Sequence, residues 1–172
     1  MAMAWMRWRR GWLAAGACLM TMQGSGALAE EHYLSATIDD QQQLHIVTTD
    51  NRDVQAKPAR DQVGVQSATV CPDHLLIGYL ALYRERGKAD PVARELVIFR
   101  DGKVQRSFSG NGEPILTWSF EADCHQVAIF QNAKRRYGSH YELRDVRTGK
   151  RVAKYDENPG RDAPQWVLDV AN

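Results

Sequence analysis

An internal repeat constrains the fold of this chain more than any other feature of its sequence. Residues 67–79 align with residues 117–129 without a gap, at an offset of 50 positions. In this alignment Asp73 matches Asp123, and both lie in a short polar stretch. In each copy a short strand ends at the polar turn, and a run of β-branched and aromatic residues supplies the return strand. Each copy is therefore predicted to form a β-hairpin.

A second pair of hairpins follows the first pair in the sequence. Residues 95–104 and 142–152 each contain an apolar segment, a turn and a return segment. Gly102 and Gly149 supply the positive φ that a tight hairpin turn requires. The repeating unit is thus four strands in about 40 to 50 residues. No stretch after residue 29 shows a helical period.

The length and strand content of this unit are typical of a β-propeller blade. The turn Cys71-Pro72-Asp73-His74, followed by an apolar strand and a later Gly-containing hairpin, resembles TolB-type and tryptophan-aspartate-type propeller repeats. The sequence departs from those repeats at His74, where Gly is usual, and at Ala122, where Pro is usual. The resemblance implies a fold and a tendency toward protein binding, without implying a reaction.

We therefore expect an all-β fold of antiparallel four-stranded blades, arranged as a partial propeller or as an open stack of sheets. The expected units are a partial blade at 33–57, full blades at 63–108 and 114–155, and a terminal strand at 164–170. Complete propellers have about four to eight blades, so these units cannot close a ring alone. Because exposed sheet edges invite pairing, the sequence also predicts a homodimer.

The first 29 residues differ in composition from the rest of the chain. They contain all five Met, three of the five Trp and no acidic residue. Arginines precede an apolar run at 11–22, which is shorter than the roughly 20 residues that span a bilayer. Ala27 and Ala29 are the small residues that signal peptidase prefers. We expect a signal peptide cleaved after Ala29, with residues 30–172 forming one periplasmic or secreted domain.

Two other kinds of leader use the same residues. Arg9-Arg10 loosely resembles a twin-arginine signal, and the residues up to Cys18 loosely resemble a lipoprotein signal. An exported chain enters an oxidising compartment, so Cys71 and Cys124 are expected to form a disulfide rather than a metal pair or a nucleophile. Two separate buried thiols are the alternative.

Charge excludes one class of function. After residue 29 the chain has 19 Lys and Arg against 21 Asp and Glu, a net charge of −2. A strongly basic nucleic-acid binder is therefore excluded. The positive charges gather instead in two loops that the repeat makes equivalent, and the candidate binding residues are Arg84, Arg86, Lys88, Lys134, Arg135, Arg136 and Tyr137.

Equivalent loops of neighbouring blades emerge on one face, so these cations could steer an anionic partner such as an acidic protein surface, a polysaccharide or a phospholipid head group. The alternative is that the loops are charged only for solubility. Trp118 and Trp166 could form a second, aromatic surface, although equivalent blade positions are more often buried.

No catalytic, cofactor-binding or metal-ligating residue can be assigned from motifs. The five His lack zinc-site spacings, and neither a nucleophile elbow nor a phosphate-binding loop occurs. His74 and His125 lie beside Asp73 and Asp123 in the matching turns, which leaves an acid–base or metal cluster as an alternative to solvated turns.

The sequence favours a small exported module that binds another envelope or secreted protein, in the manner of an inhibitor or immunity protein. An enzymatic role is not favoured. The alternatives are an envelope hydrolase that uses the Asp and His turn residues, and a structural subunit that completes a propeller by oligomerisation.

Overall fold

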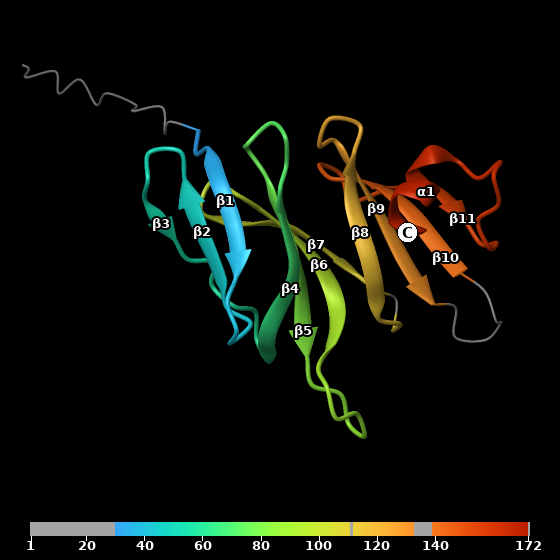
Figure 1. The fold of residues 1–172 in the computed structure, drawn as a ribbon, viewed down its shortest axis with the longest axis horizontal. Helices are drawn as coiled ribbons and strands as arrows, with labels where there is room; N and C mark the ends of the chain where they lie inside the picture. The colour runs from blue at the N-terminus through green and yellow to red at the C-terminus, as the bar shows by residue number, and fades with distance from the viewer. Residues whose placement is uncertain (1–29, 111, 133–138, 172) are drawn as a thin grey trace, which may run out of the picture.

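The computed structural model describes residues 30–110, 112–132 and 139–171, and these residues form three antiparallel β-sheets followed by a helix (Figure 1). The first sheet contains β1 (Tyr33–Ile38), β2 (Leu44–Thr48) and β3 (Asp53–Val54). The second contains β4 (Gln62–Val70), β5 (Ile77–Tyr83), β6 (Val92–Arg100) and β7 (Lys103–Ser109). The third contains β8 (Ile115–Glu121), β9 (Gln126–Asn132), β10 (Ser139–Asp145) and β11 (Arg151–Tyr155).

The predicted all-β class is confirmed. Each sheet is a meander in which strands that are consecutive in the chain are also neighbours in the sheet. The second and third sheets span 62–109 and 115–155, against the expected units at 63–108 and 114–155. The described sheets do not close into a ring, and the expected leader at 1–29 lies outside the described residues.

Residues with positive φ form the tight turns of the hairpins. Gly102 has φ +70° between β6 and β7, and Gly149 has φ +74° between β10 and β11. His74 has φ +61° in the β4–β5 turn. The propeller repeats that this turn resembles usually have Gly at this position. A left-handed conformation is therefore needed there, and His74 adopts it at some steric cost.

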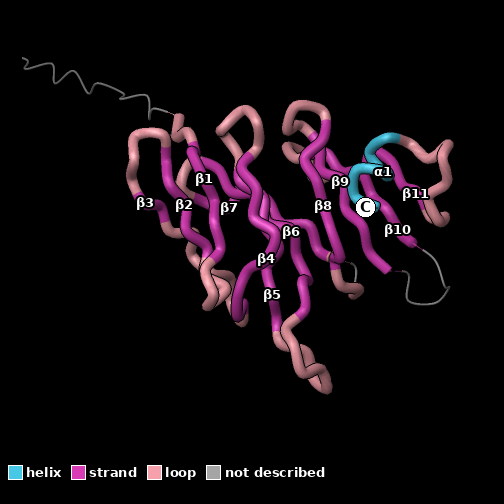
Figure 2. Tube along the Cα trace, viewed as in Figure 1, coloured by secondary structure: helices cyan, strands magenta, loops and turns pink. Residues whose placement is uncertain are grey.

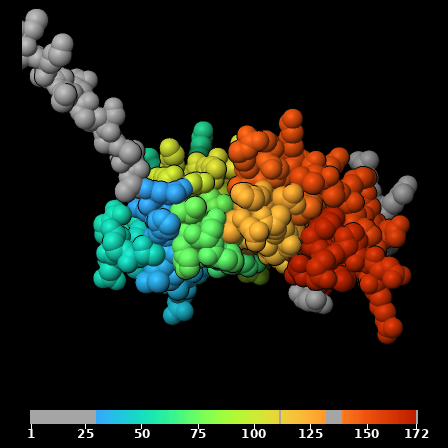
Figure 3. Space-filling view, turned by 90° about the horizontal axis from the view of Figure 1, so that it is seen from above, coloured from blue at the N-terminus to red at the C-terminus, as the bar shows by residue number. Residues whose placement is uncertain are grey.

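The sheets are arranged along the long axis of the molecule in chain order (Figures 2 and 3). The core between the first two sheets includes Tyr33, Ile46 and Tyr79. The core between the second and third sheets includes Leu96 and Ile129. Each full sheet alternates its buried residues between two faces, so the second sheet contributes to both cores.

The disulfide between Cys71 and Cys124 is confirmed, with a Cα–Cα separation of 6.1 Å. It joins the β4–β5 turn to the β8–β9 turn, and these two turns lie side by side at one end of the molecule (Figure 1). Both cysteines are buried in the core between the second and third sheets. The covalent bond thus locks the contact between those sheets.

The expected terminal strand at 164–170 is wrong, because the segment forms the helix α1 (Gln165–Ala171). The Pro164 carbonyl accepts hydrogen bonds from the amides of Val167 and Leu168, which begins the first turn. Val167 and Val170 are buried at a spacing of three, which suits one face of a helix. They pack with Tyr141 on the far face of the third sheet, so α1 caps that end of the stack (Figure 2).

The part of the chain that the structure describes contains no helix that could span a lipid bilayer.

Candidate functional site

The β5–β6 loop, residues 84–91, projects from the end of the second sheet opposite the disulfide (Figure 1). Its first part contains three of the predicted binding residues, and the side chains of Arg84, Arg86 and Lys88 are all exposed. The Lys88 amide donates to the Glu85 carbonyl at 3.1 Å, and Gly87 has φ +84°, which is the geometry of a type II turn. The tip of the loop is therefore a defined turn.

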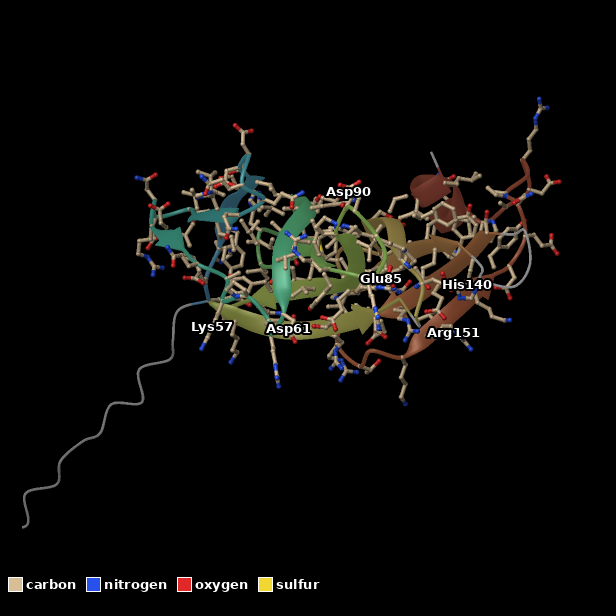
Figure 4. The ribbon with its side chains drawn as sticks, turned by 90° about the horizontal axis from the view of Figure 1, so that it is seen from below. Lys57, Asp61, Glu85, Asp90, His140 and Arg151 are labelled. Carbon is tan, nitrogen blue, oxygen red and sulfur yellow. A yellow bond between two sulfur atoms is a disulfide. The ribbon has the colours of Figure 1, made fainter. Side chains whose placement is uncertain are left out.

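Glu85 organises the charges of this loop. Its carboxylate contacts Arg94 on β6 and lies 2.6 Å from the Lys88 ammonium. Only 28% of the Glu85 side chain, labelled in Figure 4, is exposed, and its contact with Arg94 on β6 turns it toward the body of the protein. Arg84 and Arg86 form no ion pair with any residue in the described ranges. The acidic residue is thus used internally while two guanidinium groups face solvent.

The second predicted loop lies in a segment that the structure does not describe. Lys134, Arg135, Arg136 and Tyr137 lie outside the described residues. The strands that flank them are described, and β9 ends at the same end of the molecule as β5 (Figure 1). The offset of 50 therefore aligns strand ends that share one side of the stack.

The two Asp-His turns lie next to each other, but the side chains of Asp73 and His74 in the first turn have structural partners. The Nδ1 atom of His74 lies 2.7 Å from the Tyr33 carbonyl, and the Tyr33 amide donates to the His74 carbonyl at 2.7 Å. These bonds attach β1 to the β4–β5 turn. The Asp73 carboxylate accepts from the Leu75 amide at 2.9 Å, and His125 is exposed. His74 is therefore a link between sheets.

Asp73 also lies within 4.8 Å of the sulfur atoms of Cys71 and Cys124. The two sulfurs are bonded to each other, so neither is available as a thiolate ligand. The grouping therefore has only one carboxylate to offer a metal ion.

A buried ion network on the third sheet was not anticipated. The Glu142 side chain is 1% exposed and contacts the guanidinium of Arg144 at 2.5 Å and that of Arg151 at 3.1 Å. The Nε2 atom of His140 lies 3.3 Å from Glu142, and its Nδ1 lies 2.5 Å from Asp156. Figure 4 shows His140 and Arg151 on the same side of the molecule.

Burial acts to raise the pKa of Glu142, but hydrogen bonds from Arg144, Arg151 and His140 outweigh it and hold the pKa below its usual value. The signal in the sequence is the alternation of His140, Glu142 and Arg144 along one strand face. Glu142 pairs in register with Ile129, which belongs to the core between the second and third sheets. The network therefore borders that core, and its ion pairs neutralise the buried Glu142 carboxylate there.

A cleft of about 550 Å³ lies between the first and second sheets. Its walls are the β1–β2 loop and the start of β2, the segment 53–58, and the beginning of β4 with Tyr79 behind it. We call it the inter-sheet cleft. Five glutamines line it, which are Gln41, Gln42, Gln43, Gln55 and Gln62. The sequence offered no motif for this site, because its walls come from segments that lie up to 40 positions apart.

The two tryptophans of the possible aromatic surface are half-buried. The Trp118 ring lies against Gly78 and Phe120, and its Nε1 donates to the Ser67 carbonyl at 3.1 Å. Trp166 packs with the cluster under α1. Both rings therefore contribute to contacts between elements.

No protein-family model matches this chain, and a search of curated proteins finds no match either.

Proposed function

We propose that this chain is an exported protein-binding module, and that the projecting β5–β6 loop engages an acidic surface of another envelope or secreted protein. The observation that carries the proposal is the division of charge in this loop. Glu85 is held by Arg94 and Lys88, whereas Arg84 and Arg86 are exposed and have no ionic partner in the described residues.

A loop of this kind suits recognition because it is already ordered, so little conformational entropy is lost when a partner binds. The turn at Gly87 and the Glu85–Arg94 ion pair hold the loop before any partner arrives. The second sheet carries this loop, and at the opposite end of that sheet the disulfide joins it to the third sheet. Exposed guanidinium groups can form bidentate hydrogen bonds with carboxylates, which favours Asp- and Glu-rich protein surfaces as the target. The disulfide is also compatible with an oxidising, extracytoplasmic location.

The test is capture of partners from an envelope extract of the source cells on immobilised residues 30–172. The Arg84→Ser/Arg86→Ser variant should bind the captured protein about tenfold more weakly, since two favourable charge contacts are lost. Binding by the unaltered chain should also fall as salt rises from about 0.05 M to about 0.5 M.

The matched control is Arg147→Ser/Arg161→Ser, which removes the same charge from two other exposed positions. This control should retain the affinity of the unaltered chain. Equal capture by the unaltered chain and by the Arg84→Ser/Arg86→Ser variant would contradict the proposal. Equal losses in both double variants would also contradict it, because they would show that net charge alone decides binding.

A further inference from the structure

We propose that the inter-sheet cleft binds a short, uncharged peptide segment in an extended conformation. The cleft contains neither Arg84 nor Arg86, so this inference does not rest on the proposed role of the β5–β6 loop. Its volume of about 550 Å³ lies within the range of roughly 300 to 1,000 Å³ that is typical of ligand sites.

The charge of the lining disfavours an anionic ligand. Asp39 and Asp53 contribute two carboxylates, and no Lys or Arg is among the described residues that line the cleft. Hydrogen bonds from His45, at 2.8 Å, and from the amides of Gln43 and Gln41 lower the pKa of Asp39, which is therefore ionised at neutral pH. An added anion would meet uncompensated negative charge.

The polar groups of the lining suit amide recognition. A carboxamide presents one acceptor and two donors, which matches the alternating groups of a peptide backbone. Gln43 and Gln62 already bond to neighbouring backbone, and Gln62 accepts from the Ala59 amide at 3.0 Å. The side chains of Gln41, Gln42 and Gln55 bond to no described residue, so their carboxamides are available to a ligand.

Gln42 is placed for this role by its backbone. It has φ +60°, and its carbonyl accepts from the Val65 amide at 3.0 Å, which attaches the loop to β4. A Cβ atom on Gly64 would lie 2.9 Å from Gln42 Cβ and 2.9 Å from Gln42 Oε1. Glycine at position 64 thus makes room for the Gln42 side chain over β4.

The strands that border the cleft favour a peptide over a sugar. Of the strands that border the cleft, β3 has a free edge, since it pairs only with β2 in the described sheets, whereas the outer side of β4 lies against β1. The free edge of a strand can pair with an extended peptide. The rest of the lining is largely aliphatic, including Leu44, Val54 and Val63. Sugars often stack on exposed Phe, Tyr or Trp rings, whereas Tyr79, the one residue of these three types described in the lining, is 2% exposed.

Tyr79 adds a polar group at the back of the cleft. The nearby Tyr83 hydroxyl donates to Glu95 at 3.1 Å, but the Tyr79 hydroxyl has no hydrogen-bond partner in the described ranges. Burial and the charge of Glu95 raise the pKa of Tyr79 to about 12, so it stays a neutral hydroxyl. This hydroxyl is therefore free to donate to a ligand at the back of the cleft.

The test is a titration of residues 30–172, labelled with ¹⁵N, followed by amide chemical shifts. The probes are the blocked peptides acetyl-Ala-Gln-Val-Ala-amide and acetyl-Ala-Glu-Val-Ala-amide, which differ in charge but hardly in shape, and maltotriose. The Gln peptide should produce saturable shifts at Gln42, Gln55 and Gly64. The Glu peptide should bind about three- to fivefold more weakly, because it meets the two carboxylates.

Asp53→Asn should reduce the difference in affinity between the two peptides, because it removes one of the two carboxylates. The exposed Asp53 carboxylate bonds to no described residue, so its loss should not disturb the fold. Asp162→Asn is the matched control and should leave the difference unchanged. Arg84→Ser/Arg86→Ser should leave binding of the Gln peptide within about twofold. The proposal would be overturned by the absence of saturable shifts, by equal binding of both peptides, or by maltotriose shifting the same amides.

Discussion

The contact between Gly78 and Trp118 is expected to couple the second and third sheets. A Cβ atom on Gly78 would lie 2.2 Å from Cη2 of Trp118, whereas carbon atoms in contact are about 3.5 to 4.0 Å apart. In Gly78→Ala the indole must therefore move by more than about 1 Å. Overpacking costs about 1 to 3 kcal/mol, and loss of the Trp118–Ser67 hydrogen bond adds about 1 kcal/mol. The free energy of unfolding should fall by about 2 to 4 kcal/mol.

Urea denaturation followed by circular dichroism measures this loss. Gly160→Ala is the matched control, because a Cβ atom there meets nothing within 4 Å, and it should change stability by less than about 0.5 kcal/mol. In a Trp118→Leu background the Gly78→Ala change should cost less than about 1 kcal/mol, since the ring is gone. The reasoning is refuted if Gly78→Ala costs no more than Gly160→Ala, or if its cost is the same with and without Trp118.

Three further outcomes are expected. Replacing Cys71 and Cys124 with Ala should lower the free energy of unfolding by about 4 kcal/mol, because a closed loop with a separation of 53 residues is released, and a loss under about 1 kcal/mol in denaturant titrations would contradict this. His74→Ala should cost about 1 kcal/mol and speed hydrogen exchange in β1, whereas His125→Ala should leave β1 unchanged. Glu142→Gln should cost about 2 kcal/mol at pH 7, and its difference from the unaltered chain should shrink as the pH falls toward 3.

The sign of the Glu142 effect follows from its lowered pKa. A carboxyl group whose pKa is lower in the folded chain than in the unfolded chain stabilises the fold above its unfolded pKa. That contribution is lost as the pH falls through the folded value. A difference between the two chains that grows on acidification would show that Glu142 does not act as a paired carboxylate.

The hairpins were accessible to sequence reasoning because their information is local. A turn at Gly102 or Gly149 depends on a few adjacent residues, and the alternation of each strand spans only about six. The disulfide was accessible for a different reason, because two cysteines follow residue 29 and an exported chain enters an oxidising compartment.

The helix α1 shows how local similarity can mislead. Residues 164–167 echo a strand start at 114–118, but in the folded chain they lie over the apolar far face of the third sheet. A helix buries Val167 and Val170 together against that face, whereas a strand would point them in opposite directions. The packing partner therefore decided the secondary structure.

The amino-acid sequence by itself determined the four-stranded units, their turns and the cysteine pair, since each depends on short-range patterns or on simple counting. Tertiary structure alone decided which charges are free, because Glu85 finds Arg94 across a loop and Glu142 finds Arg151 across a hairpin. It also created the inter-sheet cleft, whose walls come from three separate segments and from Tyr79 on β5. Distances between such segments depend on how whole sheets pack, and no local pattern encodes that packing.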